Sequence, residues 1–598
     1  VLETMGFARH KARDERAVRL NAISKKLEPY SNEHLADALN AMQRGEKATT
    51  AEGRIAQREV QKALADTLKY MQEAGVNIAH IGAKDGVPYF PRVWDIDYIS
   101  KNQSDFLNML SKYERQGKLT GAKTLMNEMI ARDGAEFGVE TREPGMQFKK
   151  ERLLSFIEHA DAAEFMSKDL YQTLNSYITQ ATRRAEWTRR FGDGGEKLTA
   201  LLDKAKEQGA QEKHLELTEQ YLKGVDGTLG DSLNPRARRL MGDMVVYQNI
   251  RLLPLAIFSS IVDPAGLVVN GASVKEAWST FKRGIKEIPL GFKDQTKAPK
   301  DRWTDMAETL GVIDSAVLHN SIGALYSHGM VGDTARKIND GFFRLNLMEQ
   351  FNRSMRIGAT EAATKFIAKQ AEGGSPHSRR WLAELGLKAS DIKKHEGGLA
   401  FTEEHGLSKE EAAKMRAAIN QWVDGAVLRP DAADKPIWMN DPHFMLIAHL
   451  KQFMYSFHQT ILKKVGHEFT HGNSGPALAL ASYVPIMIAA DAAKGMIQGG
   501  GGQPEFKEGW SFADYVWSGL QRAGVFGVGQ MGIDVATDIH RGGVGLGAVT
   551  GPTIGQLTDV VELTGGHKQF APVALHALPA NALYGGLVKG GAKADPMF

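Results

Sequence analysis

The sequence predicts an all-α fold, an elongated multi-helix architecture with a glycine-rich, weakly charged C-terminal region. Two observations lead to this prediction. Apolar residues recur at helical spacing through the first two-thirds of the chain, while strand signals are rare. The glycine content then rises, because residues 499–598 hold 22 of the 62 glycines. With 598 residues, the chain is long enough for several domains.

The first helix that stands out covers residues 51–74 and is followed by Gly75, which favours a helix end. Residues 146–191 and 198–222 form two further helical stretches with polar turns. The apolar positions of the 51–74 helix recur at helical spacing and are Ile55, Val60, Leu64, Leu68 and Met71.

The segment 87–94 contains aromatic and β-branched residues, but its two prolines favour an extended connector over a strand. We expect four regions. These are an N-terminal helical region with this connector (1–145), a helical domain with basic clusters (146–250), a central helical domain (251–472), and an apolar, glycine-rich region for membrane or subunit packing (473–598).

The overall composition excludes several classes of protein. Hydrophobic residues make up 42% and charged residues 24%, unlike a disordered acidic tail or a polytopic membrane protein. The absence of cysteine excludes disulfide scaffolds, thiolate zinc sites, iron–sulfur clusters and cysteine nucleophiles. A net charge of +3 argues against nucleic-acid binding over the whole surface, but it allows a local basic stripe.

Two apolar segments, 252–262 and 476–490, are shorter than the roughly 20 residues that a spanning helix needs. Each is either a buried core helix or a segment that is buried in one state and contacts lipid in another. The region after Gly499 has 14 charged residues in 100 positions, and its small residues allow close packing against other chains or lipid. The alternative is a loop-rich tail that wraps the core of its own chain.

The sharpest local motif is HEFTH, formed by His467, Glu468 and His471. On a helix, this spacing places two imidazoles one turn apart to bind zinc, and the glutamate can act as general base. However, the segment from Gly472 predicts a helix end directly after the second histidine, and no third ligand is evident. The alternative is a helix C-terminus at which histidine favours the helix dipole. We therefore predict no metal and no cofactor, with the zinc site as the alternative.

A GxGxxG pattern occurs at Gly527, Gly529 and Gly532, but the residues before it do not predict the strand that a dinucleotide site requires. A chance match in a glycine-rich region is the simpler explanation. The chain has no GxxxxGK[ST] and no GxSxG pattern, so phosphoryl transfer and hydrolase-elbow chemistry lack support.

Two basic clusters could contact phosphate, on DNA or on lipid headgroups. The alternative is a solvated face whose arginines pair with nearby acids. The candidate residues are Arg183, Arg184, Trp187, Arg189 and Arg190 in the first cluster, and Arg236, Arg238 and Arg239 in the second.

Five blocks, in order along the chain, resemble the C-terminal region of the large internal virion, or DNA-ejection, proteins of short-tailed bacteriophages and related large polyvalent phage proteins. In that family the first block is YFPRVYD-like and the second is an E-x-x-N-R helix. The third block is RP, followed by PxWM and then by an FQFKSFxYSF-like helix. Two further blocks lie nearer the C-terminus. Here they lie at residues 89–95, at 348–353 with Arg356, at 428–430 with 436–442 and 449–457, at 522–527 and at 578–584.

This resemblance implies a structural function. Such proteins are stored in the virion interior near the portal, leave through the tail, and reassemble as a conduit for DNA across the host periplasm and inner membrane. The resemblance thus implies a homo-oligomer with several partners: other internal virion proteins, the portal or tail, viral double-stranded DNA as cargo, and inner-membrane lipid. The family often carries an enzyme in the N-terminal part of the polypeptide, and we expect any such domain to lie outside this chain.

On this interpretation the chain is not an enzyme and has no catalytic residues. The block around Glu349 and Arg353 places both residues on one helix face, four positions apart, as a buried structural pair. The segments 252–262 and 476–490 and the tail after Gly499 are the candidates for lipid or subunit packing. A zinc metallopeptidase and a DNA-binding internal virion scaffold are the alternatives.

Overall fold

The computed structural model describes most of the chain up to Ser482. The described residues are 2–77, 90–91, 93–132, 157–226, 235–253, 263–287, 301–315, 338–339, 341–343, 347–396, 398–428, 436–444, 455–482, 485 and 511. The predicted all-α class is confirmed, since β1 (Lys394–His395) and β2 (Gly398–Leu399) are the only named strands in this part of the chain, and they form one short antiparallel pair.

The described residues fall into two compact units. Unit 1 comprises those within Val1–Leu240, Glu308–Lys337 and Asn440–Pro442. Unit 2 comprises those within Met241–Ala307, Ile338–Met439 and His443–Phe598.

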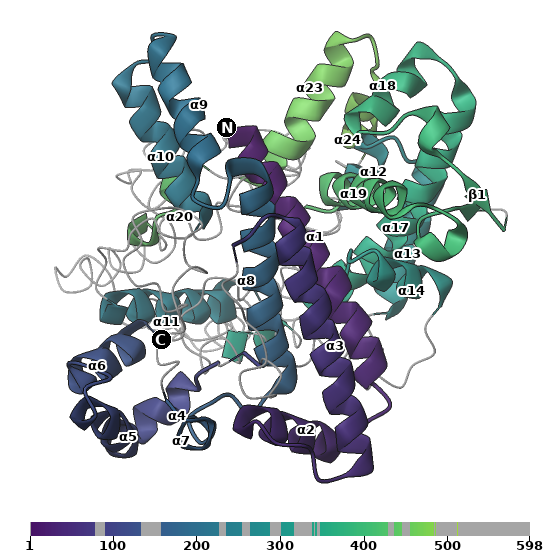
Figure 1. Cartoon of the computed structure of the whole chain (residues 1–598). Coiled ribbons are helices and arrows are strands. Elements are labelled where there is room, and N and C mark those ends of the chain that lie inside the picture. The colour runs from purple at the N-terminus through teal and green to yellow at the C-terminus, as the bar shows by residue number, and fades with distance from the viewer. Residues whose placement is uncertain are drawn as a thin grey trace, which may run out of the picture. The chain divides into compact units, whose positions relative to one another are not determined.

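Unit 1 is built on three long helices, α1, α3 and α8, which pack against one another (Figure 1). Its helices are α1 (Leu2–Leu27), α2 (Asn32–Arg44), α3 (Ala51–Glu73), α4 (Ile96–Lys101), α5 (Gln103–Arg115), α6 (Ala122–Arg132), α7 (His159–Ala163), α8 (Leu170–Phe191), α9 (Glu196–Glu207) and α10 (Glu212–Asp226). Helix α11 (Pro235–Leu252) begins in this unit and continues into the other.

Helix α3 follows the sequence prediction closely. It begins at the N-cap Thr50, whose hydroxyl accepts a hydrogen bond from the Gly53 amide, and it ends before Gly75, whose φ is +85°. Val60, Leu64 and Met71 are buried as expected, whereas Ile55 is 39% exposed. The stretch predicted at 198–222 is divided into α9 and α10.

The two cores of unit 1 join residues from both sides of position 145. One packs Leu64 and Met71 of α3 against Leu174 and Ile178 of α8. The other packs Phe106 against Phe165, with ring centroids 5.0 Å apart. The regions predicted at 1–145 and 146–250 therefore share their cores.

The described part of the connector predicted at 87–94 lies against the chain before α8. The Asp95 amide donates to the Phe165 carbonyl at 2.9 Å, and the Ser167 amide donates to the Val93 carbonyl at 2.7 Å. These bonds hold the connector against the chain before α8. Asp95 then caps α4 by accepting from the Tyr98 amide.

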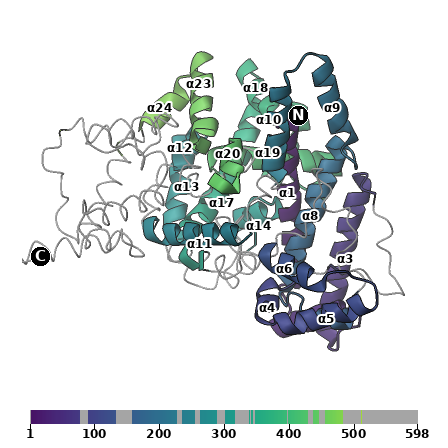
Figure 2. The ribbon, with the colours of Figure 1, turned by 90° about the vertical axis from the view of Figure 1, so that its left-hand side faces the viewer.

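Unit 2 is organised around the long helix α17, which packs against α13, α18 and α19 (Figures 1 and 2). Its elements are α12 (Asp263–Val269), α13 (Val274–Glu287), α17 (Met348–Gly373), α18 (Pro376–Glu384), η6 (Ala389–Asp391), η7 (Glu403–His405), α19 (Lys409–Ala426), η10 (His458–Leu462), α23 (Lys463–Thr470) and α24 (Gly475–Ser482). Helices α14 (Arg302–Thr309) and α20 (Ile437–Asn440) and the turn η9 (Pro442–Phe444) fall at the unit boundaries.

A buried ion pair joins α17 to α19. Arg356 is 2% exposed, and its Nη2 lies 2.7 Å from Asp424 Oδ1, while its Nη1 donates to the Val427 carbonyl at 3.4 Å. The fully buried arginine of the 348–356 block is thus Arg356, while Glu349 is buried and Arg353 is only partly buried.

Among the described residues, no helix is long and apolar enough to cross a membrane. In the apolar segment 476–490, residues 476–482 form most of α24. Ala479 and Leu480 of this helix are buried, and Leu478 is 67% exposed. The GxGxxG pattern and the blocks at 522–527 and 578–584 lie outside the described residues. So do 254–262 and, apart from Ser511, the region 499–598.

Candidate functional site

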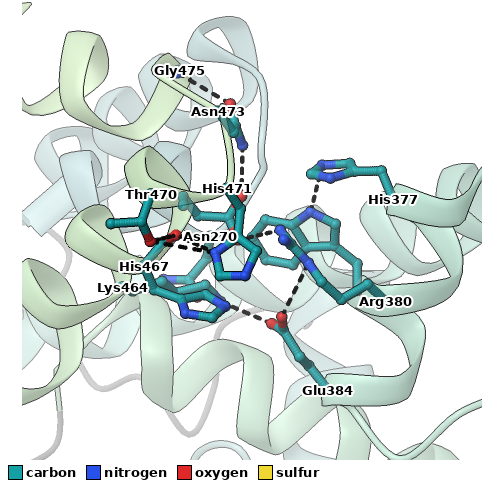
Figure 3. A network of polar contacts seen from close by, with 12 residues as sticks. Asn270, His377, Arg380, Glu384, Lys464, His467, Thr470, His471, Asn473 and Gly475 are labelled. Atoms are coloured by element: carbon teal, nitrogen blue, oxygen red, sulfur yellow. Dashed lines mark hydrogen bonds and ion pairs between the residues drawn. The ribbon is translucent and has the colours of Figure 1, made fainter.

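The HEFTH motif lies in a cluster of charged and polar side chains contributed by α18, α23 and the turn after α23 (Figure 3). Arg380 and Glu384 are one turn apart on α18. Lys464 precedes His467 and Glu468 by about one turn on α23, so all three project from one side of that helix. We call the following residues the Glu468 cluster: Arg380, Glu384, Lys464, His467, Glu468 and Asn473.

Glu468 is the buried centre of this cluster, with no exposed surface. Its Oε1 accepts from Arg380 Nη2, and its Oε2 accepts from Asn473 Nδ2 at 2.7 Å. Burial acts to raise the pKa of Glu468, but the hydrogen bonds from Asn473 and Arg380 and the arginine charge outweigh it and hold this pKa below its ordinary value. Glu468 is therefore held as a bound carboxylate, which makes it a weak general base.

Lys464 is partly buried beside Glu468. Its Nζ donates to Asn270 Oδ1 at 2.8 Å, lies 4.0 Å from Glu384 Oε2, and sits 4.3 Å from the centroid of the Trp381 ring. Burial lowers the pKa of Lys464, and the carboxylates of Glu384 and Glu468 offset only part of this effect.

Asn270, which follows α12, links the cluster to the rest of unit 2. Its Nδ2 donates at 2.8 Å to the carbonyls of both Gly266 and Gly425, and its own carbonyl accepts from Trp422 Nε1 at 3.0 Å. The amide side chain of Asn270 therefore satisfies backbone groups of α12 and α19 and orients Lys464 at the same time. Such hydrogen bonds are typical of a residue that holds packed helices together.

The two histidines of HEFTH lie at the exposed end of α23. His471 is the C-cap residue, and Gly472 follows with φ of +79°, which confirms the predicted helix end. The rings of His467 and His471 have centroids 4.2 Å apart. Nδ1 of His471 lies 2.8 Å from the His467 carbonyl, an acceptor only, so Nδ1 carries the proton.

The group that could hold a metal ion differs from the HEFTH set that the sequence offered as an alternative. Among the described residues it consists of Glu384, His467 and Glu468, whose ligand atoms lie within 4.8 Å of one another. His471 is not part of it. Because Arg380 already engages Glu468 and Lys464 lies beside Glu384, a cation would have to compete with two positive side chains.

The first predicted phosphate cluster lies on α8 and is mostly engaged inside unit 1. Glu186, with no exposed surface, accepts from Tyr70, from Arg189 at 3.0 Å and from Arg190. Burial acts to raise the pKa of Glu186, but the bonds from Tyr70 and Arg190 outweigh it, so this pKa is lowered. Arg184 pairs with Asp193 Oδ1 at 2.6 Å.

Trp187 is also directed inward, 5% exposed, with its ring centroid 4.6 Å from that of Phe191. It is therefore not placed to meet a headgroup from the surface of unit 1. Arg183 is the member of this cluster that is exposed. In the second cluster, Arg236, Arg238 and Arg239 lie in the first turns of α11, and their side chains are outside what the structure describes.

Four residues of this site and its support are not predicted by the sequence: Asn270, Arg380, Glu384 and Lys464. The only available signal was the spacing of Arg380 and Glu384, which places opposite charges one turn apart. Nothing in the sequence links either residue to Glu468, 88 positions beyond Arg380.

Comparisons with protein-family models, with curated proteins and with solved structures found no match to this chain.

Proposed function

We propose that this chain is a structural, non-catalytic phage ejection protein. It forms part of a homo-oligomeric conduit that carries viral DNA through the host cell envelope, at the inner membrane. Before infection it is stored in the virion interior with other ejection proteins, near the portal or tail. The proposal starts from the five sequence blocks that resemble this family.

The observation that carries the proposal is the contact between the second block and the residues directly before the third block. Arg356 belongs to the second block, and it binds Asp424 and the Val427 carbonyl, directly before the third block begins at Leu428. One buried guanidinium therefore joins the second block to Val427, 71 positions further along the chain and directly before the third block. This contact supports a packing role for the second block and hence a structural protein.

The helical, cysteine-free architecture is compatible with passage through a narrow tail. Helices re-form mainly local contacts, which is fast, and no disulfide opposes unfolding during transit. These properties support the proposed route without singling it out among helical proteins.

The zinc peptidase alternative has less support from the geometry. It requires Glu468 as a free base, but this residue is buried and bound by Arg380 and Asn473. The measurement that decides this alternative is the zinc content of the purified chain. Stoichiometric zinc that is lost in a His467→Ala variant would establish a metal site, and a zinc-free chain would remove the alternative.

The DNA-binding scaffold alternative depends on the arginines of α8 and α11. Because Arg184, Arg189 and Arg190 are paired with acids, we expect the first cluster to add little affinity for duplex DNA. A steep salt-dependent affinity that falls in an Arg183→Ala variant would favour this alternative over the conduit.

The conduit is tested with the full chain added to lipid vesicles. We expect release of an encapsulated dye and passage of labelled duplex DNA into the vesicles. A charge at Leu478, which is exposed on α24 in the 476–490 segment, should abolish both effects. Leu478→Lys is compared with Leu201→Lys, at an exposed leucine of α9 in unit 1. An intact chain that neither releases dye nor admits DNA would contradict the proposal.

A further inference from the structure

Helix α13 carries an exposed apolar stripe that no described residue covers. Val274 is 65% exposed, Trp278 is 48% exposed and Ile285 is 50% exposed. At about 100° per residue, these three side chains project within about 40° of one another around the helix axis. They therefore form one continuous line rather than scattered surface residues.

The stripe lies beside the face that fixes α13 in unit 2. Ala277, Thr280, Phe281 and Gly284 are buried against α17. Glycines allow a close approach there, since a Cβ at Gly284 would lie 3.0 Å from the Phe351 ring. The helix is thus anchored by one face while its neighbouring apolar edge remains outside the core.

The start of α13 is fixed as well. The Ser273 amide donates to Glu276 Oε2 at 2.8 Å, and the Glu276 amide donates to Ser273 Oγ at 3.2 Å, which forms a reciprocal cap. The Trp278 ring stacks on Phe281 with centroids 5.4 Å apart. The stripe is therefore presented by a preformed helix, and binding through it would not require folding.

Three lysines border the stripe on its solvent side. Lys275, Lys282 and Lys286 are exposed, and at helical spacing they project about 40–80° beyond Trp278. Lys282 Nζ lies 5.6 Å from the Trp278 ring centroid. The acidic residue of the first turn, Glu276, lies on the far side of the lysines and is bound to Ser273.

We propose that this edge of α13 is a binding surface for an anionic lipid membrane. An apolar line with tryptophan, edged by lysines whose stems can extend toward headgroups, fits the boundary between headgroups and acyl chains. The lysines complement negatively charged headgroups. A protein partner fits less well, because three apolar side chains are few against the roughly 20–30 residues per side of a stable protein interface.

This proposal does not rest on the conduit function. A protein of any function could bind a membrane through α13, and a conduit could form through other segments. The two are distinguished because the α13 experiment measures binding alone, whereas the conduit experiment measures dye release and DNA passage.

The experiment is flotation of the full chain with phosphatidylcholine vesicles that contain or lack phosphatidylglycerol. We expect binding to the anionic vesicles, weakened by salt, and much less binding to phosphatidylcholine alone. A Trp278→Ser/Ile285→Ser variant should reduce the affinity by about tenfold or more, because it removes the inserted apolar side chains. Changing Lys275, Lys282 and Lys286 to glutamate should reduce the affinity for anionic vesicles by at least as much.

Matched controls come from exposed residues of unit 1. The apolar control is Leu201→Ser/Leu217→Ser. The charge control changes Lys197, Lys204 and Lys206 of α9 to glutamate. Both should bind like the unmodified chain. Conservative variants, Trp278→Phe and the three lysines changed to arginine, should retain binding, which separates loss of the surface from loss of the fold.

Three outcomes would overturn the proposal. The first is that the unmodified chain fails to float with anionic vesicles, and the second is that the α13 variants float as well as the unmodified chain. The third is that the α13 substitutions reduce the molar mass measured by light scattering without changing vesicle binding, which would identify a second copy of the chain as the partner.

Discussion

Glu468 stands at the general-base position of the HEFTH motif, but it is fully buried. HEFTH has the spacing of a zinc site, yet the glutamate is enclosed and bound by Arg380 and Asn473. A carboxylate with two charge-assisted or amide hydrogen bonds contributes to stability and is unavailable for proton transfer.

We therefore predict that Glu468→Gln destabilises unit 2 by about 2 kcal/mol, because Arg380 loses the buried one of its two carboxylate partners, Glu468 and Glu384. The measurement is chemical denaturation of the full chain. His471→Ala, at the exposed end of the same helix, should change stability by less than about 0.5 kcal/mol. Equal effects of the two substitutions would argue that the histidines share the structural role of the glutamate.

The sign of the pH effect at this residue follows from its lowered pKa. The stabilisation from Glu468 is fully present above the ordinary glutamate pKa and is lost as pH falls through the lower folded-state value. The stability difference between the chain and Glu468→Gln should therefore shrink as the solution is acidified. A difference that stays constant down to strongly acidic pH would contradict this assignment.

At the scale of elements, α12 approaches the end of α19 closely. A Cβ on Gly266 would lie 2.1 Å from the Ala426 carbonyl oxygen, which belongs to the backbone and cannot rotate away. We predict that Gly266→Ala destabilises unit 2 by about 1–3 kcal/mol, measured by thermal unfolding.

The matched control is Gly466→Ala on α23, where a Cβ would meet no atom within 4 Å. Alanine restricts the unfolded chain and favours a helix, so this variant should gain up to about 1 kcal/mol. If both glycine variants behaved alike, the close packing of α12 on α19 would not be responsible for the first effect.

Helix α19 has a reciprocal cap whose charge state can be followed by titration. Glu411 accepts from the Ser408 amide at 2.8 Å and lies 2.9 Å from Lys393. The backbone bond from Ser408, followed by the bond from Lys393, lowers the pKa of Glu411 from 4.5 to about 2. Since the folded-state pKa is depressed, the stabilisation is present above pH 4.5 and is lost as pH falls toward 2.

Glu411→Gln should accordingly lower the melting temperature near neutral pH and leave it unchanged near pH 2. Thermal unfolding followed by circular dichroism over a pH series measures this. Ser408→Ala should cost about 1 kcal/mol across the series, because its hydroxyl does not titrate.

At the scale of the molecule, separate cores predict separate unfolding. The cores of unit 1 join α1, α3 and α8 and, separately, α4 to α7, while unit 2 is built around α17. We predict at least two calorimetric transitions for the full chain. Leu64→Ala should lower the free energy of unfolding of unit 1 by about 2–5 kcal/mol and so shift one transition. Gly266→Ala should destabilise unit 2 and shift another. A single transition that both variants shift equally would show that the units unfold together.

The sequence by itself determined the all-α class, the limits of α3 and the helix end after His471. Each depends on local chemistry: apolar residues at helical spacing, the Thr50 cap, and glycines at Gly75 and Gly472 that adopt positive φ. Such features act over a few residues, so they can be recognised without knowing what the helix packs against.

Only the tertiary structure decided which polar residues are enclosed and what they bind. The sequence does not mark Glu186 or Glu468 as enclosed, yet both have no exposed surface. Arg380 of α18 binds Glu468, and Asn270 after α12 binds Lys464, and both partners lie far away along the chain. Burial and charge pairing depend on which helices meet, and that is set by the summed packing of many side chains, which no local pattern encodes.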